Sequence, residues 1–162
     1  MSATFAWSES SGAGESITDG ISNCNFGSVD SPNLVPASNL IQIGANSFGK
    51  YIRGKFTGTW TVISNILFWK SAGALLTGET IKASANATYA TPSASSTGDS
   101  DCPTTEGTAL AINSAEGAAT IVYGASGVSG YTGYIRLQLQ TTGSTPVGVA
   151  NQKTFVMQYD ES

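Results

Sequence analysis

The side chains that most often do chemistry in enzymes are scarce in this chain. There is no histidine among the 162 residues, and cysteine occurs only as Cys24 and Cys102. Without histidine, Ser-His-Asp and Cys-His catalysis and histidine-ligated metals are excluded. Two cysteines are too few for a tetrahedral thiolate zinc site, and no glycine motif for phosphate or dinucleotide binding occurs. The sequence therefore predicts a protein that is not an enzyme and that uses no cofactor.

Two groups of carboxylates are the remaining candidates for a chemical site. They are Asp99, Asp101 and Glu106 in one polar segment, and Glu9, Glu15 and Asp19 near the N-terminus. Carboxylate oxygens are ligands that Ca²⁺ prefers, so each group is a candidate calcium site, with ordinary solvated charge as the alternative. A glycosidase needs two carboxylates that flank a cleft, and no spacing in the sequence predicts such a pair. We therefore expect neither a catalytic nor a metal site.

Other polar and aromatic side chains are candidates for contacts with a partner protein. They lie on strand faces opposite the apolar positions, where a solvated surface is the alternative reading. The candidate partner-contact residues are Tyr51, Arg53, Lys55, Trp69, Gln138 and Gln140. Trp69 is also a candidate platform for a sugar ring.

Period-two alternation of apolar and polar residues predicts the elements that carry these side chains. It places Ile52, Phe56, Trp60 and Val62 on the core face of segment 48–62, and further strands follow at 64–71 and 79–84. Segments 134–140 and 153–159 alternate most clearly and predict a C-terminal antiparallel hairpin with a long connection. Helical spacing is nearly absent. The predicted fold is an all-β antiparallel sandwich, jelly-roll or immunoglobulin-like.

The domain organisation follows from where the alternation weakens. Residues 1–46 are rich in Gly, Ser, Asn and Pro, which predicts an N-terminal arm or loop-rich layer, and residues 47–162 are expected to form the β-sandwich. Segments 8–20 and 90–107 read as polar loops. Long loops in a compact domain are usually functional or flexible, so we expect at least one to touch a neighbouring subunit.

Composition limits the classes of partner. Charged residues make up 11% of the chain, less than half the usual share of about 25%, and the formal net charge is −4. So few charges suit a surface that other subunits cover, including copies of the same chain, and an extracellular domain solubilised by hydroxyl and amide groups is the alternative. Seven basic residues are too few for a nucleic-acid partner, and no apolar run is long enough to span a membrane.

The first residues suggest where the protein is made. Segment 1–4 has neither the basic nor the apolar region of a signal peptide, so we expect synthesis and folding in a cytoplasm. There, Cys24 and Cys102 stay reduced by default, although their pairing is left open.

Several runs along the chain resemble a group of small virion proteins of tailed bacteriophages. These runs are FAWSES (5–10), GE (14–15), NFGSVD (25–30), FTG (56–58), FWKS (68–71) and TFVMQYDE (154–161). The resemblance implies a β-sandwich, often with an N-terminal arm that reaches onto adjacent subunits, located in the virion. It implies no catalytic residue.

The function that this resemblance implies is structural. We expect a capsid decoration (cement) protein that binds the major capsid protein or other virion proteins and stabilises the capsid lattice. A neck, tail or baseplate component is one alternative, and a carbohydrate-binding β-sandwich on the tail is another.

Overall fold

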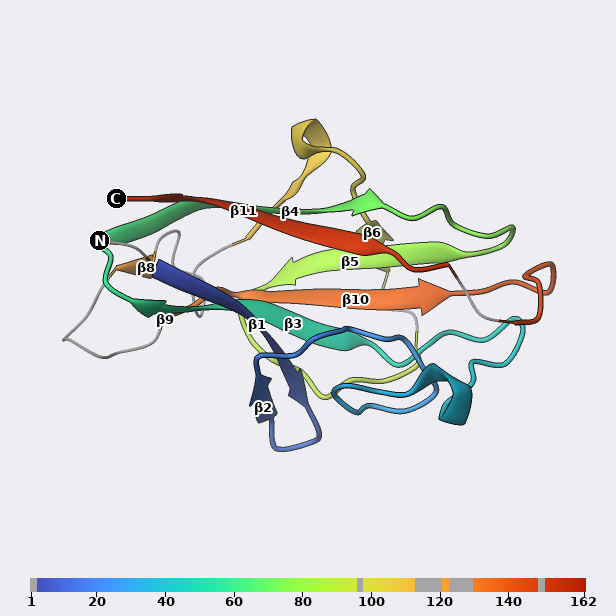
Figure 1. Cartoon of the computed structure of the whole chain (residues 1–162). Helices are drawn as coiled ribbons and strands as arrows, with labels where there is room; N and C mark the ends of the chain where they lie inside the picture. Colours follow the sequence, from blue (N-terminus) through green and yellow to red (C-terminus); the bar gives the residue numbers. More distant parts are fainter. Residues whose placement is uncertain (1–2, 96–97, 113–120, 123–129, 149–150) are drawn as a thin grey trace.

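A computed structural model of the chain describes residues 3–95, 98–112, 121–122, 130–148 and 151–162. These residues form two antiparallel β-sheets, joined by connections that contain two short 3-10 helices, Pro36–Ser38 and Glu106–Thr108 (Figure 1). The predicted all-β antiparallel sandwich is confirmed; its jelly-roll or immunoglobulin-like connectivity stays a prediction. No helix in the described part of the chain is long and apolar enough to cross a membrane.

The larger sheet has six strands in its main path. In spatial order they are β2 (Ser16–Asp19), β1 (Ala3–Ser11), β3 (Lys50–Gly58), β10 (Tyr134–Gln140), β5 (Thr80–Asn86) and β6 (Ser100–Asp101); β9 (Gly130–Tyr131) also pairs with β3. The smaller sheet consists of β11 (Thr154–Glu161), β4 (Val62–Ala72) and β7 (Leu110–Ala111), with β8 (Ile121–Val122) also paired with β4.

The core lies between the two sheets and follows the predicted alternation. Ile52 and Phe56 of β3 point into it, as do Ile135 and Leu137 of β10, and Phe68 of β4 packs on them from the other sheet. Each of these side chains is almost fully buried. The predicted strand 48–62 ends earlier, at Gly58, whose φ of 97° is a backbone conformation that favours glycine and begins the turn into β4.

The N-terminal segment is part of this core. β1 pairs with β3 from Ala3 to Ser10, so it is an internal strand between β2 and β3. Its Trp7 ring packs edge-on against Phe68, with centroids 6.2 Å apart. The segment 1–46, expected to be an arm or loop-rich layer, therefore begins with a sheet strand, β1, in the described residues. The loop-rich part follows at 20–49.

The predicted C-terminal hairpin is wrong. β10 lies between β3 and β5 in the larger sheet, whereas β11 pairs with β4 in the smaller sheet. Their connection therefore crosses from one sheet to the other. Alternation indicates which face of a strand is apolar, but it carries no information on which strand lies beside it.

Candidate functional site

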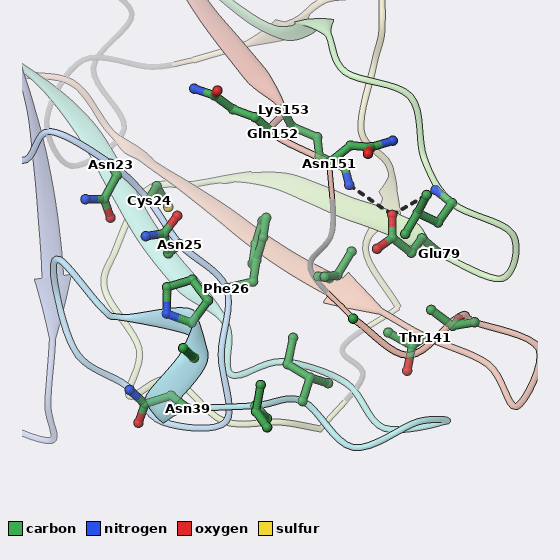
Figure 2. A pocket seen from close by; sticks show the side chains of 18 of the residues that line it. Asn23, Cys24, Asn25, Phe26, Asn39, Glu79, Thr141, Asn151, Gln152 and Lys153 are labelled. Atoms are coloured by element: carbon green, nitrogen blue, oxygen red, sulfur yellow. Dashed lines mark hydrogen bonds and ion pairs between the residues drawn. The ribbon is translucent and has the colours of Figure 1, made fainter.

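A large cleft opens at the end of the sandwich where β10 ends and β3, β5 and β11 begin. It has a volume of about 960 Å³, within the range of about 300–1,000 Å³ that is typical of ligand sites. One wall is the loop-rich segment 21–43, and the opposite wall is the connection 141–148 with residues 151–155 (Figure 2). We call this space the interlayer cleft, because it lies between the loop-rich segment and the two sheets.

The floor of the interlayer cleft is apolar because it continues the core of the sandwich. Trp7, Ile52, Leu139 and Phe155 line it from four different strands. Ile21, Phe26 and Ile41 extend this surface from the loop-rich segment. A bound group that reaches the floor would therefore be apolar.

Apolar side chains also surround the mouth of the cleft. Leu40, Ile43 and Val147 line it while exposing 64%, 51% and 87% of their surface. Single exposed apolar residues are common on protein surfaces. Three that converge on one apolar cleft are the pattern of an interaction site.

Carboxamide side chains are the main polar groups of the walls. Asn23, Asn25 and Asn39 lie on the loop-rich side, and Asn151 and Gln152 lie on the side that leads into β11 (Figure 2). A carboxamide both donates and accepts hydrogen bonds, as a peptide group does. The amides of Asn25 and Asn39 already donate to the carbonyls of Leu34 and Val35, so these two side chains can offer their oxygens as acceptors to the backbone of a bound polypeptide.

The charged groups in the cleft neutralise one another. Lys153 Nζ lies 2.9 Å from Glu79 Oε2, and the same carboxylate accepts a 2.9 Å hydrogen bond from the Leu76 amide. Both side chains of this ion pair are largely buried. The cleft therefore presents no uncompensated charge from this pair and favours an uncharged occupant.

β11 borders the cleft and is the last strand of its sheet. In the described residues it pairs with β4 on one side and with no strand on the other. Its register with β4 shifts at Thr154/Phe155 and again between Gln158 and Asp160. Such irregularities and charged ends are common on edge strands, because an open edge can pair with another chain.

Three of the expected partner-contact residues are buried within the chain. Tyr51, Arg53 and Gln138 do lie on the face opposite the core, but other parts of the chain cover that face. Tyr89 packs against Tyr51, Tyr131 lies against Arg53, and Ser47 and Ser95 contact Gln138. Gln138 Nε2 donates to the carbonyls of Ser47 and Ser95 at 3.0 and 3.2 Å. These three residues could therefore contact a partner only if this cover rearranged, and their role in partner contact stays a prediction.

Arg53 illustrates how this face is filled. Its guanidinium carbon lies 4.1 Å from the ring centroid of Tyr131 and 4.7 Å from that of Tyr134. Nη1 also donates to the Tyr134 hydroxyl at 3.1 Å, and that hydroxyl donates to Glu15 at 2.6 Å. The cation is thus held by aromatic faces and a nearby carboxylate inside the protein.

Lys55, Trp69 and Gln140 are the partly exposed members of the expected contact set. Lys55 is engaged in an ion pair with Asp19 at 2.5 Å. Trp69 lies on the outer face of β4, opposite Val156 of β11, and Gln140 donates to Gln138. The structure spreads these residues over two sheets, so they do not form one site.

The two groups of carboxylates are dispersed as well. In the described part of the chain, all of these carboxylates except Glu106 form an ion pair: Asp99 with Arg136, Asp101 with Lys82, Glu9 with Lys50, Glu15 with Arg53 and Asp19 with Lys55. Among the described residues, no group of three His, Cys, Asp or Glu side chains is placed to hold a metal ion. Calcium binding at either group is therefore not favoured by the geometry.

Cys24 and Cys102 are separate free thiols. Burial and the nearby Glu9 carboxylate raise the pKa of Cys24 to about 12, and burial raises that of Cys102 to about 11. Both thiols are therefore protonated near neutral pH, which makes them poor nucleophiles and poor metal ligands.

Sequence reasoning missed the residues at the mouth of the cleft. Leu40 and Ile43 lie in the segment predicted as an N-terminal arm or loop-rich layer, and Val147 lies in the long connection of the predicted C-terminal hairpin. The run Leu40-Ile41-Gln42-Ile43 was the available signal, because several apolar residues in one loop indicate a surface that another segment or molecule covers.

Comparisons with models of known protein families, with curated proteins and with solved structures find no match to this chain.

Proposed function

We propose that this protein is a non-enzymatic structural component of a phage virion, most simply a capsid decoration protein, that holds an apolar segment of another virion protein in the interlayer cleft. The observation that carries the proposal is the cleft itself, with its apolar floor, neutral walls and exposed apolar mouth. The location in a virion rests on the resemblance of the sequence runs described above.

The edge strand beside the cleft favours an extended polypeptide as the occupant. The open edge of β11 offers unpaired backbone groups beside it, and addition of a strand to such an edge is a common mode of peptide recognition. Alternate side chains of the added strand would point toward Phe155 and the apolar floor. Carboxamides such as Asn151 and Gln152 would satisfy the backbone beyond the paired stretch.

Location is tested by quantitative mass spectrometry of purified virions of the phage that encodes the chain. A copy number that matches the capsid lattice supports decoration, and one that matches a single ring supports the neck or tail alternative. Absence from purified virions overturns the proposal.

The role of the cleft is tested by a matched pair of substitutions. Ile43→Ser changes the mouth of the cleft, whereas Ile17→Ser changes an isoleucine of similar exposure on β2, away from it (51% and 45% exposed). Neither is expected to change the free energy of unfolding by more than about 0.5 kcal/mol. We expect only Ile43→Ser to reduce incorporation into particles; equal incorporation of both variants would show that the cleft is not the docking site.

A further inference from the structure

A lysine and a glutamate lie in direct contact inside the sandwich with no access to solvent. Lys50 Nζ of β3 is 2.7 Å from Glu9 Oε1 of β1, and both side chains are 0% exposed. The two strands are neighbours, since Glu9 is directly opposite Ile52. The two side chains therefore lie on the same face of the sheet, and the sheet itself holds them together.

This pair is poorly satisfied for a buried ion pair. Glu9 Oε2 is buried and accepts no hydrogen bond, although a buried carboxylate normally needs donors on both oxygens. Burial raises the pKa of Glu9 and outweighs the opposing charge and hydrogen bond of Lys50; the charge of Asp30 raises it further. The surroundings therefore favour an uncharged arrangement of these two groups.

The amine of Lys50 is held within reach of the Glu9 carboxyl group. Nζ also donates to the Ser31 carbonyl at 2.6 Å, which fixes its position beside Glu9. The carboxyl carbon is one bond beyond Oε1, so nitrogen and carbon lie near the distance of about 3–3.5 Å that precedes bond formation. Asp30, adjacent to Ser31, has a buried Oδ1 without a hydrogen-bond partner, and its charge acts on Glu9, so it is a candidate to carry a proton.

We propose that Lys50 and Glu9 form an intramolecular isopeptide bond that joins β3 to β1. A proton passes from the Lys50 ammonium to the Glu9 carboxylate, leaving a neutral amine and a carboxylic acid. The nitrogen lone pair attacks the carboxyl carbon, and a second proton moves from nitrogen, by way of Asp30, to the departing hydroxyl. A C–N bond forms, a C–O bond breaks, and one water molecule leaves. The reaction needs no oxidant, reductant or activated co-reactant.

The consequences of the bond follow from where it lies. It replaces two buried charges by a neutral amide in a site without solvent exposure, so hydrolysis is disfavoured. It also ties together the two ends of segment 9–50, which contains β2 and one wall of the interlayer cleft. The loop-rich wall is then held by a covalent bond at its base.

The buried ion pair of Lys153 and Glu79 provides a matched control. It has a similar separation, 2.9 Å, but the Glu79 carboxylate accepts a second hydrogen bond, from the Leu76 amide. Both residues also line the cleft, where water has access. An amide is therefore not expected at this second pair.

The test is the intact mass of the full-length chain under denaturing conditions. We expect the wild-type protein to be lighter than its sequence by one water molecule. Trypsin does not cut after an acylated lysine, so the same loss is expected in an uncut peptide that contains both Glu9 and Lys50 and ends at Arg53. Lys50→Arg keeps the positive charge but cannot form the bond under these conditions, so it should have its full sequence mass. Lys153→Arg should still show the loss.

Several results would overturn the proposal. One is a wild-type protein of full sequence mass in a preparation that circular dichroism shows to be folded. Another is a water loss that persists in Lys50→Arg or that maps outside the peptide ending at Arg53, as a succinimide elsewhere would do. If Lys50→Arg fails to fold, the intact mass and the tryptic map of the wild-type chain decide the question without it.

Discussion

Gln138 Nε2 donates a 3.0 Å hydrogen bond to the Ser47 carbonyl, on the face of β10 that its sequence pattern assigns to solvent. Both residues are 0% exposed. β10 is therefore buried on both faces: by the apolar core on one side, and by segments 42–49 and 87–95 on the other. This arrangement changes what a substitution on the polar face should do.

Replacing Gln138 by alanine is expected to destabilise the fold. It removes the hydrogen bonds to Ser47 and Ser95, and the loss of buried hydrogen bonds of this kind costs about 1–3 kcal/mol. Leu137→Ala, on the core face, should cost roughly 2–5 kcal/mol through lost burial and a cavity. Chemical denaturation measures both. The control is Gln158→Ala, an exposed glutamine of β11, which should change stability by no more than about 0.5 kcal/mol.

The β2 edge of the larger sheet is expected to loosen in acid. Burial raises the pKa of Asp19, but hydrogen bonds from Lys55, Ser8 and Tyr131 outweigh it and hold the pKa below the ordinary value of 3.8. The folded state therefore binds this proton less readily than the unfolded state. The stabilisation is present above the ordinary pKa and is lost as the pH falls through the lower, folded value.

Hydrogen exchange of the β2 amides, followed between about pH 6 and pH 3, measures this effect. The intrinsic change in exchange rate with pH is removed by comparison with Asp19→Asn, which has no carboxylate to titrate. Protection of β2 that falls equally in the wild type and in Asp19→Asn would assign the acid sensitivity to other groups.

Both thiols should resist alkylation in the folded protein. The pKa of Cys24 rises from 9.0 to about 12, which lowers its thiolate fraction near pH 8 about 1,000-fold, since each pKa unit is tenfold. For Cys102, the rise to about 11 lowers it about 100-fold. Iodoacetamide labelling followed by mass spectrometry should show slow modification of the native chain and rapid double modification in denaturant. Rapid labelling of Cys24 in the native protein would contradict its raised pKa.

Gly54 is expected to tolerate no side chain. A Cβ added there would lie 2.8 Å from Met157 Sδ of β11 and 2.8 Å from a ring carbon of Phe5. Forcing a methyl group into such a space typically costs about 1–3 kcal/mol. Gly54→Ala should therefore lower the melting temperature, whereas Gly107→Ala, where no atom lies within 4 Å, should not. Equal melting temperatures of the two variants would show that the two sheets can move apart at Gly54 at little cost in free energy.

The sequence alone predicted the fold class and the composition of the core. The alternation of Ile135, Leu137 and Leu139 with polar residues requires a strand with one apolar face, because successive side chains in a strand point to opposite sides. Ile52, Phe56 and Phe68 follow the same rule, and the structure buries all six. The absence of histidine restricted the available chemistry equally directly, because no fold can supply a missing side chain.

Tertiary structure decided everything that depends on contacts between distant segments. Alternation alone cannot reveal that β10 and β11 belong to different sheets, or that Tyr51, Arg53 and Gln138 are covered by other segments of the chain. Both outcomes depend on the packing of segments that are far apart in sequence. The interlayer cleft and the Lys50–Glu9 contact have the same origin. Each exists only because the fold brings residues together whose types, read along the chain, look like ordinary loop and surface positions.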